Sequence, residues 1–462
     1  MGESVLLRIL EKATGAKVAG LCIAIGLFGI APAGADTLTD ALASAYWTNP
    51  DINVARAQTR IADEALPIAK SALRPNVSGS GSIKRETRDP STGGSDSTDG
   101  AIGLRVTQDL FRGFRTKNAR LEADASILAS RQSLVSIVQD VLFDAAQAYM
   151  DVLRGQALLE LQRESVLFLD EQLKADQDRF DVGEGTRTDV AQTRARLSAA
   201  QSDVSLAEAN LNSSRAVYRQ VIGKEPGKLA PGYSFKRLIP GSLARALESG
   251  QAKHPAILAA IYNADAAAFA AKQVEGELLP TVSLEGRADR TFGIDNSNYD
   301  NSASIIGRVD IPLYQGGGVS ARVRQAKEIH GLRQIEVDVR RAQIRAAVVS
   351  SWGQLEAANA AIIAAAAQVE AARIALNGVQ EEQRVGQRTT LDVLIAEQEL
   401  VNARRTQILA RRGSIVASFL LLSSAGLLNV DSLNLPVQRH DPIAHYEAVK
   451  DRWFGLRTPD GR

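Results

Sequence analysis

Arg74-Pro75-Asn76-Val77-Ser78 returns later in the chain as Leu279-Pro280-Thr281-Val282-Ser283, displaced by 205 residues (280 − 75). The pair Val182-Gly183 likewise returns as Val385-Gly386, displaced by 203 residues (386 − 183). Matches that keep nearly one register over such a length indicate a tandem duplication. The sequence therefore predicts two copies of one structural unit.

The first copy is expected at 36–230 and the second at 231–435, followed by a C-terminal segment at 436–462. The chain has 462 residues and a net charge of +1, so nothing indicates an electrostatic field for nucleic acid. Its four histidines are scattered without the spacing of metal ligands. We therefore expect no enzyme, no cofactor, no metal site and no nucleic-acid partner.

Residues 1–35 have the pattern of a signal peptide. Basic residues precede an apolar run at 18–30 that is shorter than the about 20 residues of a spanning helix. Ala33-Gly34-Ala35 fits a cleavage site, which makes Asp36 the expected mature start. The only cysteine, Cys22, lies inside the apolar run, so neither lipidation nor a disulfide is expected. The sequence predicts an exported protein.

Each copy is expected to begin with helices. Thr37 and Asp40 have the spacing of a capping box, and Asn49-Pro50 ends one helix and starts the next. His254-Pro255 repeats that break in the second copy. Pro67 has no counterpart there, so it predicts a kink in the first copy only.

A pair of strands is expected next, at about 76–112 in the first copy and about 281–315 in the second. Apolar residues alternate with polar ones along the second pair, at Val282, Leu284, Ala303, Ile305, Val309, Ile311 and Leu313. A period of two with one apolar face is typical of strands. The segments between the strands are rich in Asp, Asn, Ser and Gly, which favours hairpin loops.

Very long helices complete each copy. No proline lies between Pro90 and Pro226, or between Pro312 and Pro436. Apolar residues recur at intervals of seven, at Leu159, Val166, Leu173 and Phe180, and again at Ile362, Val369 and Leu376. This spacing predicts helices that pack along their length as coiled coils. The stretch 115–182 corresponds to roughly 100 Å of helix.

Four amphipathic strands per chain pose a physical problem. In an exported chain they indicate an outer-membrane barrel, because only a closed sheet satisfies every backbone group in lipid. Four strands cannot close around a pore. We therefore expect a symmetric oligomer that closes both the sheet and the helical hairpins. The alternative is an exported coiled-coil scaffold or adaptor without a pore.

Three motifs carry a resemblance to a known family. The strand-to-helix junctions Leu110-Phe111-Arg112-Gly113 and Leu313-Tyr314-Gln315-Gly316-Gly317, and the helix turn at 385–394, resemble those of the TolC family of outer-membrane channels. The resemblance implies a mainly α protein with transmembrane β structure. Four strands per chain would form the twelve-stranded β-barrel of a homotrimer, continued by a long α-helical barrel and surrounded by a mixed belt.

The resemblance also implies function and partners. It implies an export duct of a tripartite efflux pump or a type I secretion system, in the outer membrane of a Gram-negative bacterium. Its partners would be a periplasmic adaptor, an inner-membrane transporter of the RND or ABC type, and outer-membrane lipid. Gly183 and Gly386 match tip positions where the adaptor docks, although glycine at a helix end can equally serve as a simple cap.

Arg388 matches a family arginine that ties one helix pair to its neighbour and holds the entrance shut. The resemblance places its partners around Thr188 and Asp189. A tyrosine that the family also uses in this contact is replaced by Gln383. The alternative is that Arg388 is a solvated surface charge.

Asp392 matches an acidic residue at the constricted entrance, where three copies would form a ring that binds cations. A second family aspartate is replaced by Ile395, so the resemblance implies either a weaker ring or one that Glu397 or Glu399 supplements. The alternative is an ordinary acidic residue near a helix N-terminus.

Overall fold

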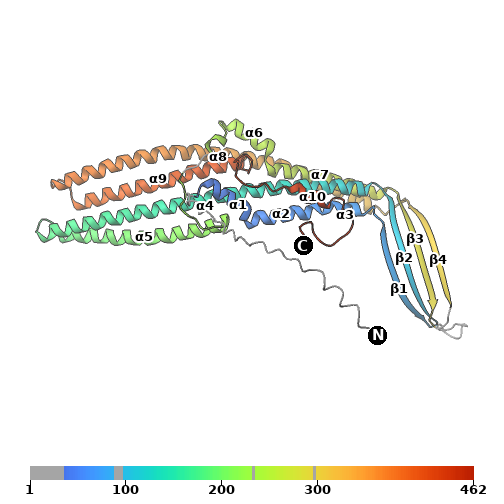
Figure 1. The fold of residues 1–462 in the computed structure, drawn as a ribbon. Coiled ribbons are helices and arrows are strands. Elements are labelled where there is room, and N and C mark those ends of the chain that lie inside the picture. The colour runs from blue at the N-terminus through green and yellow to red at the C-terminus, as the bar shows by residue number, and fades with distance from the viewer. Residues whose placement is uncertain (1–35, 88–96, 232–234, 295–297) are drawn as a thin grey trace, which may run out of the picture. The chain divides into compact units, whose positions relative to one another are not determined.

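The computed structural model describes residues 36–87, 97–231, 235–294 and 298–462, so the predicted signal peptide lies outside the described residues. Residues 36–462 form one compact unit, shown in Figure 1. The described elements are α1 (Leu38–Thr48), α2 (Pro50–Asp63), α3 (Ala65–Ser71), β1 (Asn76–Glu86), β2 (Ser97–Arg112), α4 (Arg115–Asp181), α5 (Arg187–Ile222), η2 (Phe235–Leu238), α6 (Leu243–Lys253), α7 (Pro255–Glu275), η3 (Gly276–Leu278), β3 (Thr281–Gly293), β4 (Tyr299–Asp310), α8 (Gly318–Arg384), α9 (Thr390–Ser424) and α10 (Pro442–Val449).

The four strands form one antiparallel sheet in the order β1-β2-β3-β4 (Figure 1). The two strand pairs of the duplication are joined because β2 pairs with β3, for example at Leu104 and Ala288. The outer strands β1 and β4 each pair on one side within this chain. A sheet with two such edges needs further strands to satisfy its backbone groups.

The register gives the sheet one apolar and one polar face. The apolar face carries Val77, Ile83, Ile102, Leu104, Leu284, Phe292, Ile305 and Val309, all exposed in the single chain. The polar face carries Ser78, Ser80, Arg105, Thr107, Glu285, Arg287, Asp289 and Arg308. The predicted alternation is therefore confirmed. An apolar outer face and a polar inner face are the pattern of a barrel in lipid around a wet lumen.

The last strand is shorter than expected. The alternation predicted a strand up to about residue 315, but β4 ends at Asp310. Pro312 lacks the backbone N–H that a strand ladder needs, so the pairing stops before it. Ile311 and Leu313 therefore belong to the connection to α8.

The long helices form two hairpins, α4 with α5 and α8 with α9 (Figure 1). Both α4 and α8 have 67 residues, or roughly 100 Å each at the usual rise per residue. Buried leucines at the predicted seven-residue spacing pack between the helices, among them Leu159 and Leu376. The predicted coiled-coil packing is thereby confirmed.

The expected starts and stops of the short helices are confirmed. Thr37 and Asp40 form a reciprocal capping box, and Asn49 caps α2 through the backbone N–H of Asp51. The helix breaks at Glu64, just before Pro67, whereas α7 in the second copy runs on without a break. The ring of Pro67 explains the difference, because it removes a backbone donor inside the helix.

The largest core lies where α1, α4, α5 and α9 meet the linker between the copies. Tyr149 and Tyr218 are almost fully buried there. The Tyr149 hydroxyl donates to the carbonyl oxygens of Asp36 and Ala230, at 2.8 and 2.6 Å. Burial raises the pKa of Tyr149 to about 12, so the hydroxyl keeps its proton. This contact ties the start of the first copy to the linker.

Of the described helices, α8 contains a window of mean hydropathy 1.3, apolar enough to cross a membrane by length and composition. Only 11% of that window is buried in this chain. The same helix packs against α9, with Val348 against Leu421 and Leu376 against Val393. We interpret the exposed apolar surface as a packing face for other helices, and not as a membrane span.

Candidate gate at the helix tips

The two turns between long helices have the same local geometry. Gly183 and Gly386 follow the last helical residues with φ of +82° and +76°, a left-handed conformation that favours glycine. The N–H of Gly386 donates to the carbonyl oxygen of Gln383 at 3.0 Å. Both glycines are exposed, and a Cβ at either would meet no atom within 4 Å. The cap role is thus confirmed, and the open space permits the predicted approach of a partner.

Each turn is followed by a capping box that holds a predicted site residue. Thr186 Oγ1 donates to a carboxylate oxygen of Asp189 at 2.6 Å. Thr389 Oγ1 donates to Asp392 in the same way at 2.8 Å. Bonds from the main chain and hydroxyl of Thr389 lower the pKa of Asp392, so its carboxylate is charged at neutral pH. Asp392 is therefore a cap that still presents a negative charge.

Arg388 does not contact Thr188 or Asp189 within this chain. Its Nε donates to a carboxylate oxygen of Glu382 at 2.8 Å, and both side chains are about half exposed. Glu382 was not predicted as the partner of Arg388, although the two residues flank the same turn. A contact with Thr188 and Asp189 of a neighbouring chain stays a prediction.

Glu397 does not supplement the charge of Asp392. Its side chain is buried, and burial raises the pKa of its carboxyl. Glu399 is exposed, but it lies about two turns of α9 beyond Asp392. The expectation for Glu397 is therefore wrong, because its position on α9 faces the helix packing.

A buried polar cluster close to the turns was not predicted. Asp176 of α4 is 2% exposed, and Thr193 Oγ1 of α5 donates to it at 2.6 Å. Gln172 Nε2 and Arg179 Nη2 donate at 2.9 and 3.0 Å. Thr390 Oγ1, at the start of α9, donates at 3.4 Å and so links the two hairpins. We call these five residues the Asp176 cluster.

The sequence held a signal for this cluster. The heptad run through Leu159, Val166 and Leu173 places Leu169 and then Asp176 at the other core position of the repeat. A polar residue at a core position is costly unless its hydrogen bonds are satisfied. It often fixes the pairing of helices, so this position could have marked Asp176 as a candidate, although it was not predicted.

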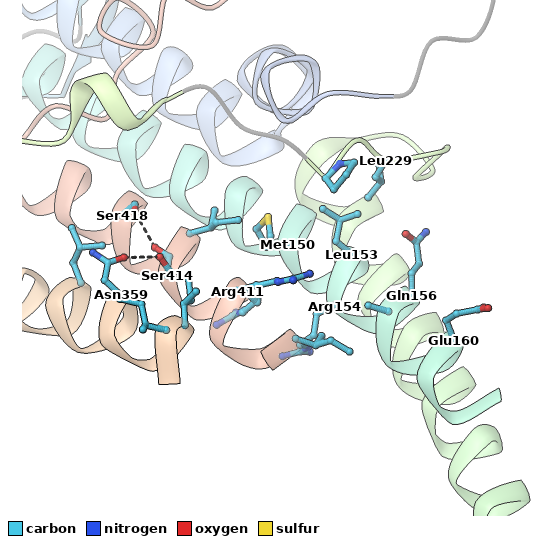
Figure 2. Close-up of a pocket in the computed structure, with 18 of the residues that line it drawn as sticks. Met150, Leu153, Arg154, Gln156, Glu160, Leu229, Asn359, Arg411, Ser414 and Ser418 are labelled. Atoms are coloured by element: carbon cyan, nitrogen blue, oxygen red, sulfur yellow. Dashed lines mark hydrogen bonds between the residues drawn. The ribbon is translucent and has the colours of Figure 1, made fainter. Parts of the chain in front are cut away.

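A pocket of about 1200 Å³ lies far from the turns, between α4, α8, α9 and the linker (Figure 2). Its wall is mainly apolar, with Met150 and Leu153 from α4. Arg412 donates to both carboxylate oxygens of Asp151, at 3.0 and 3.2 Å, which ties α9 to α4 beside the pocket. Figure 2 also shows Ser414 donating to Asn359. None of the predicted site residues lines this pocket.

The amphipathic sheet and the paired long helices define a class of protein. It is the class of outer-membrane channels in which a β-barrel continues into an α-helical barrel. Within that class, the chain belongs to the outer membrane efflux protein family, whose model matches residues 41–224 and 246–426. It is an export channel of the Gram-negative outer membrane that extends into the periplasm. The alternative of a scaffold without a pore is therefore set aside.

Two relatives show how far the similarity extends. Outer membrane efflux protein BepC of Brucella suis biovar 1 (strain 1330) is 44% identical over 430 residues, which cover 92% of this chain and 93% of the relative. Outer membrane protein TolC of Vibrio cholerae serotype O1 (strain ATCC 39315 / El Tor Inaba N16961) is 26% identical over 416 residues, covering 86% and 92%. The resemblance to the TolC family is confirmed.

The fold is also that of a solved structure. The CmeC outer membrane channel of Campylobacter jejuni superposes with a TM-score of 0.76 at 17% sequence identity. The match covers 90% of this chain and 89% of that chain. It supports the four-stranded sheet and helical hairpins as one channel fold.

Proposed function

We propose that three copies of this chain close into one duct that is gated at the helix tips. The edges of β1 and β4 carry this proposal, because each lacks a partner strand on one side within the described sheet. Pairing β1 of one copy with β4 of the next would satisfy those edges and give a twelve-stranded barrel. The exposed apolar surface of α8 would be covered in the same assembly.

The duct would work with a periplasmic adaptor and an inner-membrane transporter of the RND or ABC type. Gly183 and Gly386 are the proposed docking points, because their surroundings are open and their turns project beyond the helices. Arg388 and the Asp176 cluster would hold the hairpins in the closed arrangement. The chain itself would conduct passively, without catalysis.

A cross-linking experiment tests the closure of the barrel. The predicted mature chain has no cysteine, so one cysteine can be placed on β1 and scanned against another on β4. We expect a covalent trimer for pairs in register, and step-like conductance when the trimer enters a planar bilayer. Cross-linked dimers without a trimer, or a trimer without conductance, would contradict the proposal.

Replacing Asp392 with Ala should weaken block of the channel by trivalent cations added from the periplasmic side, on the order of tenfold. The carboxylate is charged at neutral pH, and three copies near the axis would bind such an ion together. Block is measured as the loss of single-channel current with increasing cation concentration.

Thr389→Ala is the matched control. It removes the same capping box, worth about 1 kcal/mol, and keeps the Asp392 carboxylate. If both variants change the block equally, the effect comes from the lost cap, and Asp392 does not form an entrance ring.

A further inference from the structure

The C-terminal segment 436–462 runs along the outside of the first helices toward the sheet (Figure 1). Its helix α10 contacts α2 and α4 together. His445 Nδ1 lies 3.0 Å from a carboxylate oxygen of Asp63, which is fully buried. The Tyr446 hydroxyl donates to Asp124 at 3.3 Å. These contacts hold α10 against both α2 and α4.

After α10, residues 450–452 accept hydrogen bonds from Lys70 and Arg74, close to the start of β1. Lys70 Nζ donates to the carbonyl oxygen of Lys450 and to Asp451, at 2.8 and 2.6 Å. Arg74 donates to the carbonyl oxygen of Arg452 at 2.7 Å, and its guanidinium lies 4.8 Å from the centroid of the Trp453 ring. Arg74 precedes β1 by two residues (76 − 74). Residues 450–453 therefore lie at the rim where the sheet meets the helices.

Three apolar side chains of this stretch are largely exposed in the chain. Trp453, Phe454 and Leu456 are 65%, 90% and 103% exposed. Neighbouring junctions at the same end of the sheet expose Phe114 and Tyr314. Aromatic side chains gather at the level of the lipid headgroups in membrane proteins, so this rim has the composition of an interfacial belt.

The charges beside these side chains suit a phospholipid surface. Arg452 Nε donates to the carbonyl oxygen of Phe454 at 3.3 Å. Arg452 forms no ion pair with a carboxylate among the described residues. Arg457 forms no ion pair or hydrogen bond within the described part of the chain. In a phospholipid layer the phosphate groups lie above the acyl chains. Two guanidinium groups on either side of an apolar cluster suit this arrangement, because guanidinium binds phosphate and apolar side chains enter the acyl region.

We propose that residues 450–457, the anchor segment, insert into the periplasm-facing leaflet of the outer membrane. Trp453, Phe454 and Leu456 enter the upper acyl region, and Arg452 and Arg457 bind phosphate groups. The contacts of Lys70 and Arg74 make this anchor part of the barrel rim. It would fix the height of the channel in the bilayer, a role separate from conduction and from gating.

Tryptophan fluorescence of the full chain in vesicles tests the anchor. The variant Trp47→Phe with Trp352→Phe keeps Trp453 as its one tryptophan. The vesicles contain phosphatidylethanolamine and phosphatidylglycerol brominated at the upper acyl carbons. Trp453 should lose roughly half of its emission, because an interfacial indole touches those carbons. The control Trp352→Phe with Trp453→Phe keeps Trp47, which lies by the central core and should lose none.

Acrylamide in the water phase separates the remaining outcomes. Quenching of Trp453 by acrylamide and not by brominated lipid would place the segment in water and overturn the anchor. Protection from both quenchers would show that a second copy of the chain covers it, which also overturns the anchor. Replacing Arg452 and Arg457 with Gln should reduce the bromine quenching, and unchanged quenching would remove phosphate binding from the proposal.

Discussion

Replacing Asp176 with Asn should raise the conductance of the resting channel on the order of fivefold, by shifting the population toward the open arrangement. The carboxylate is buried and accepts hydrogen bonds from Thr193, Gln172, Arg179 and Thr390. Hydrogen bonds to a charged group contribute about 1.5–3 kcal/mol each, more than bonds between neutral groups. Asparagine keeps the shape of the side chain but loses the charge and part of the accepting capacity.

The physical reason lies in which helices the cluster connects. Thr390 is the first residue of α9, whereas Asp176 lies on α4, so their bond crosses between the hairpins at the tips. Gln383 Nε2 donates to the same threonine hydroxyl at 3.2 Å and adds α8 to the network. Gln383, where the resemblance implies a tyrosine, therefore reaches Asp176 only indirectly, through Thr390. Weakening the cluster frees the tips to separate.

The measurement is single-channel conductance in planar bilayers. Asp178→Asn is the matched control, because it makes the same change two residues away on an exposed position of α4. Arg388→Ser gives the comparison with the proposed contact between chains. An Asp176→Asn channel that assembles normally and conducts like the unaltered protein would remove the cluster from the gate.

The fold could be read from the sequence because its signals are periodic. Alternation along Val282 and Leu284 gave the strands and their faces, and the heptads gave helices that end within a residue or two of the expected positions. Periodic burial follows directly from backbone geometry, so it survives in a single sequence. The end of β4 was missed because alternation continues past Pro312, where the hydrogen bonding does not.

The side-chain contacts at the proposed gate were harder to predict, because they depend on how the side chains at the helix tips pack against one another. Glu382 as the partner of Arg388 and Thr390 as a partner of Asp176 are separated by 6 and 214 residues along the chain. The seven-residue spacing of Leu394 and Val401 places Glu397, and not Glu399, at the other core position of the repeat, and this signal was overlooked. Which of these side chains contact each other becomes clear only once the helices are placed side by side.

Replacing Gly276 with Ala should prevent most copies of the protein from assembling into a barrel. We expect the free energy of folding to fall by more than about 3 kcal/mol. A Cβ on Gly276 would overlap the carbonyl oxygen of Gly113, and a Cβ on Gly113 would overlap the carbonyl oxygen of Gly276. The two glycines belong to the junctions of different copies, one between β2 and α4 and the other between α7 and β3. Backbone meets backbone there, so no side-chain rotation relieves the overlap.

Gly276 gives the cleaner variant because its backbone is right-handed helical, with φ of −62°, so alanine adds no conformational strain. Gly316→Ala is the converse control: its φ is +61°, but no atom lies within 4 Å of the added Cβ. That variant should lose only about 1 kcal/mol and still assemble. Assembly is measured as the amount of detergent-extracted trimer in the outer membrane. Normal amounts of Gly276→Ala trimer would show that the junctions can separate, and the sheet and helices would then be less rigidly joined than their close contact indicates.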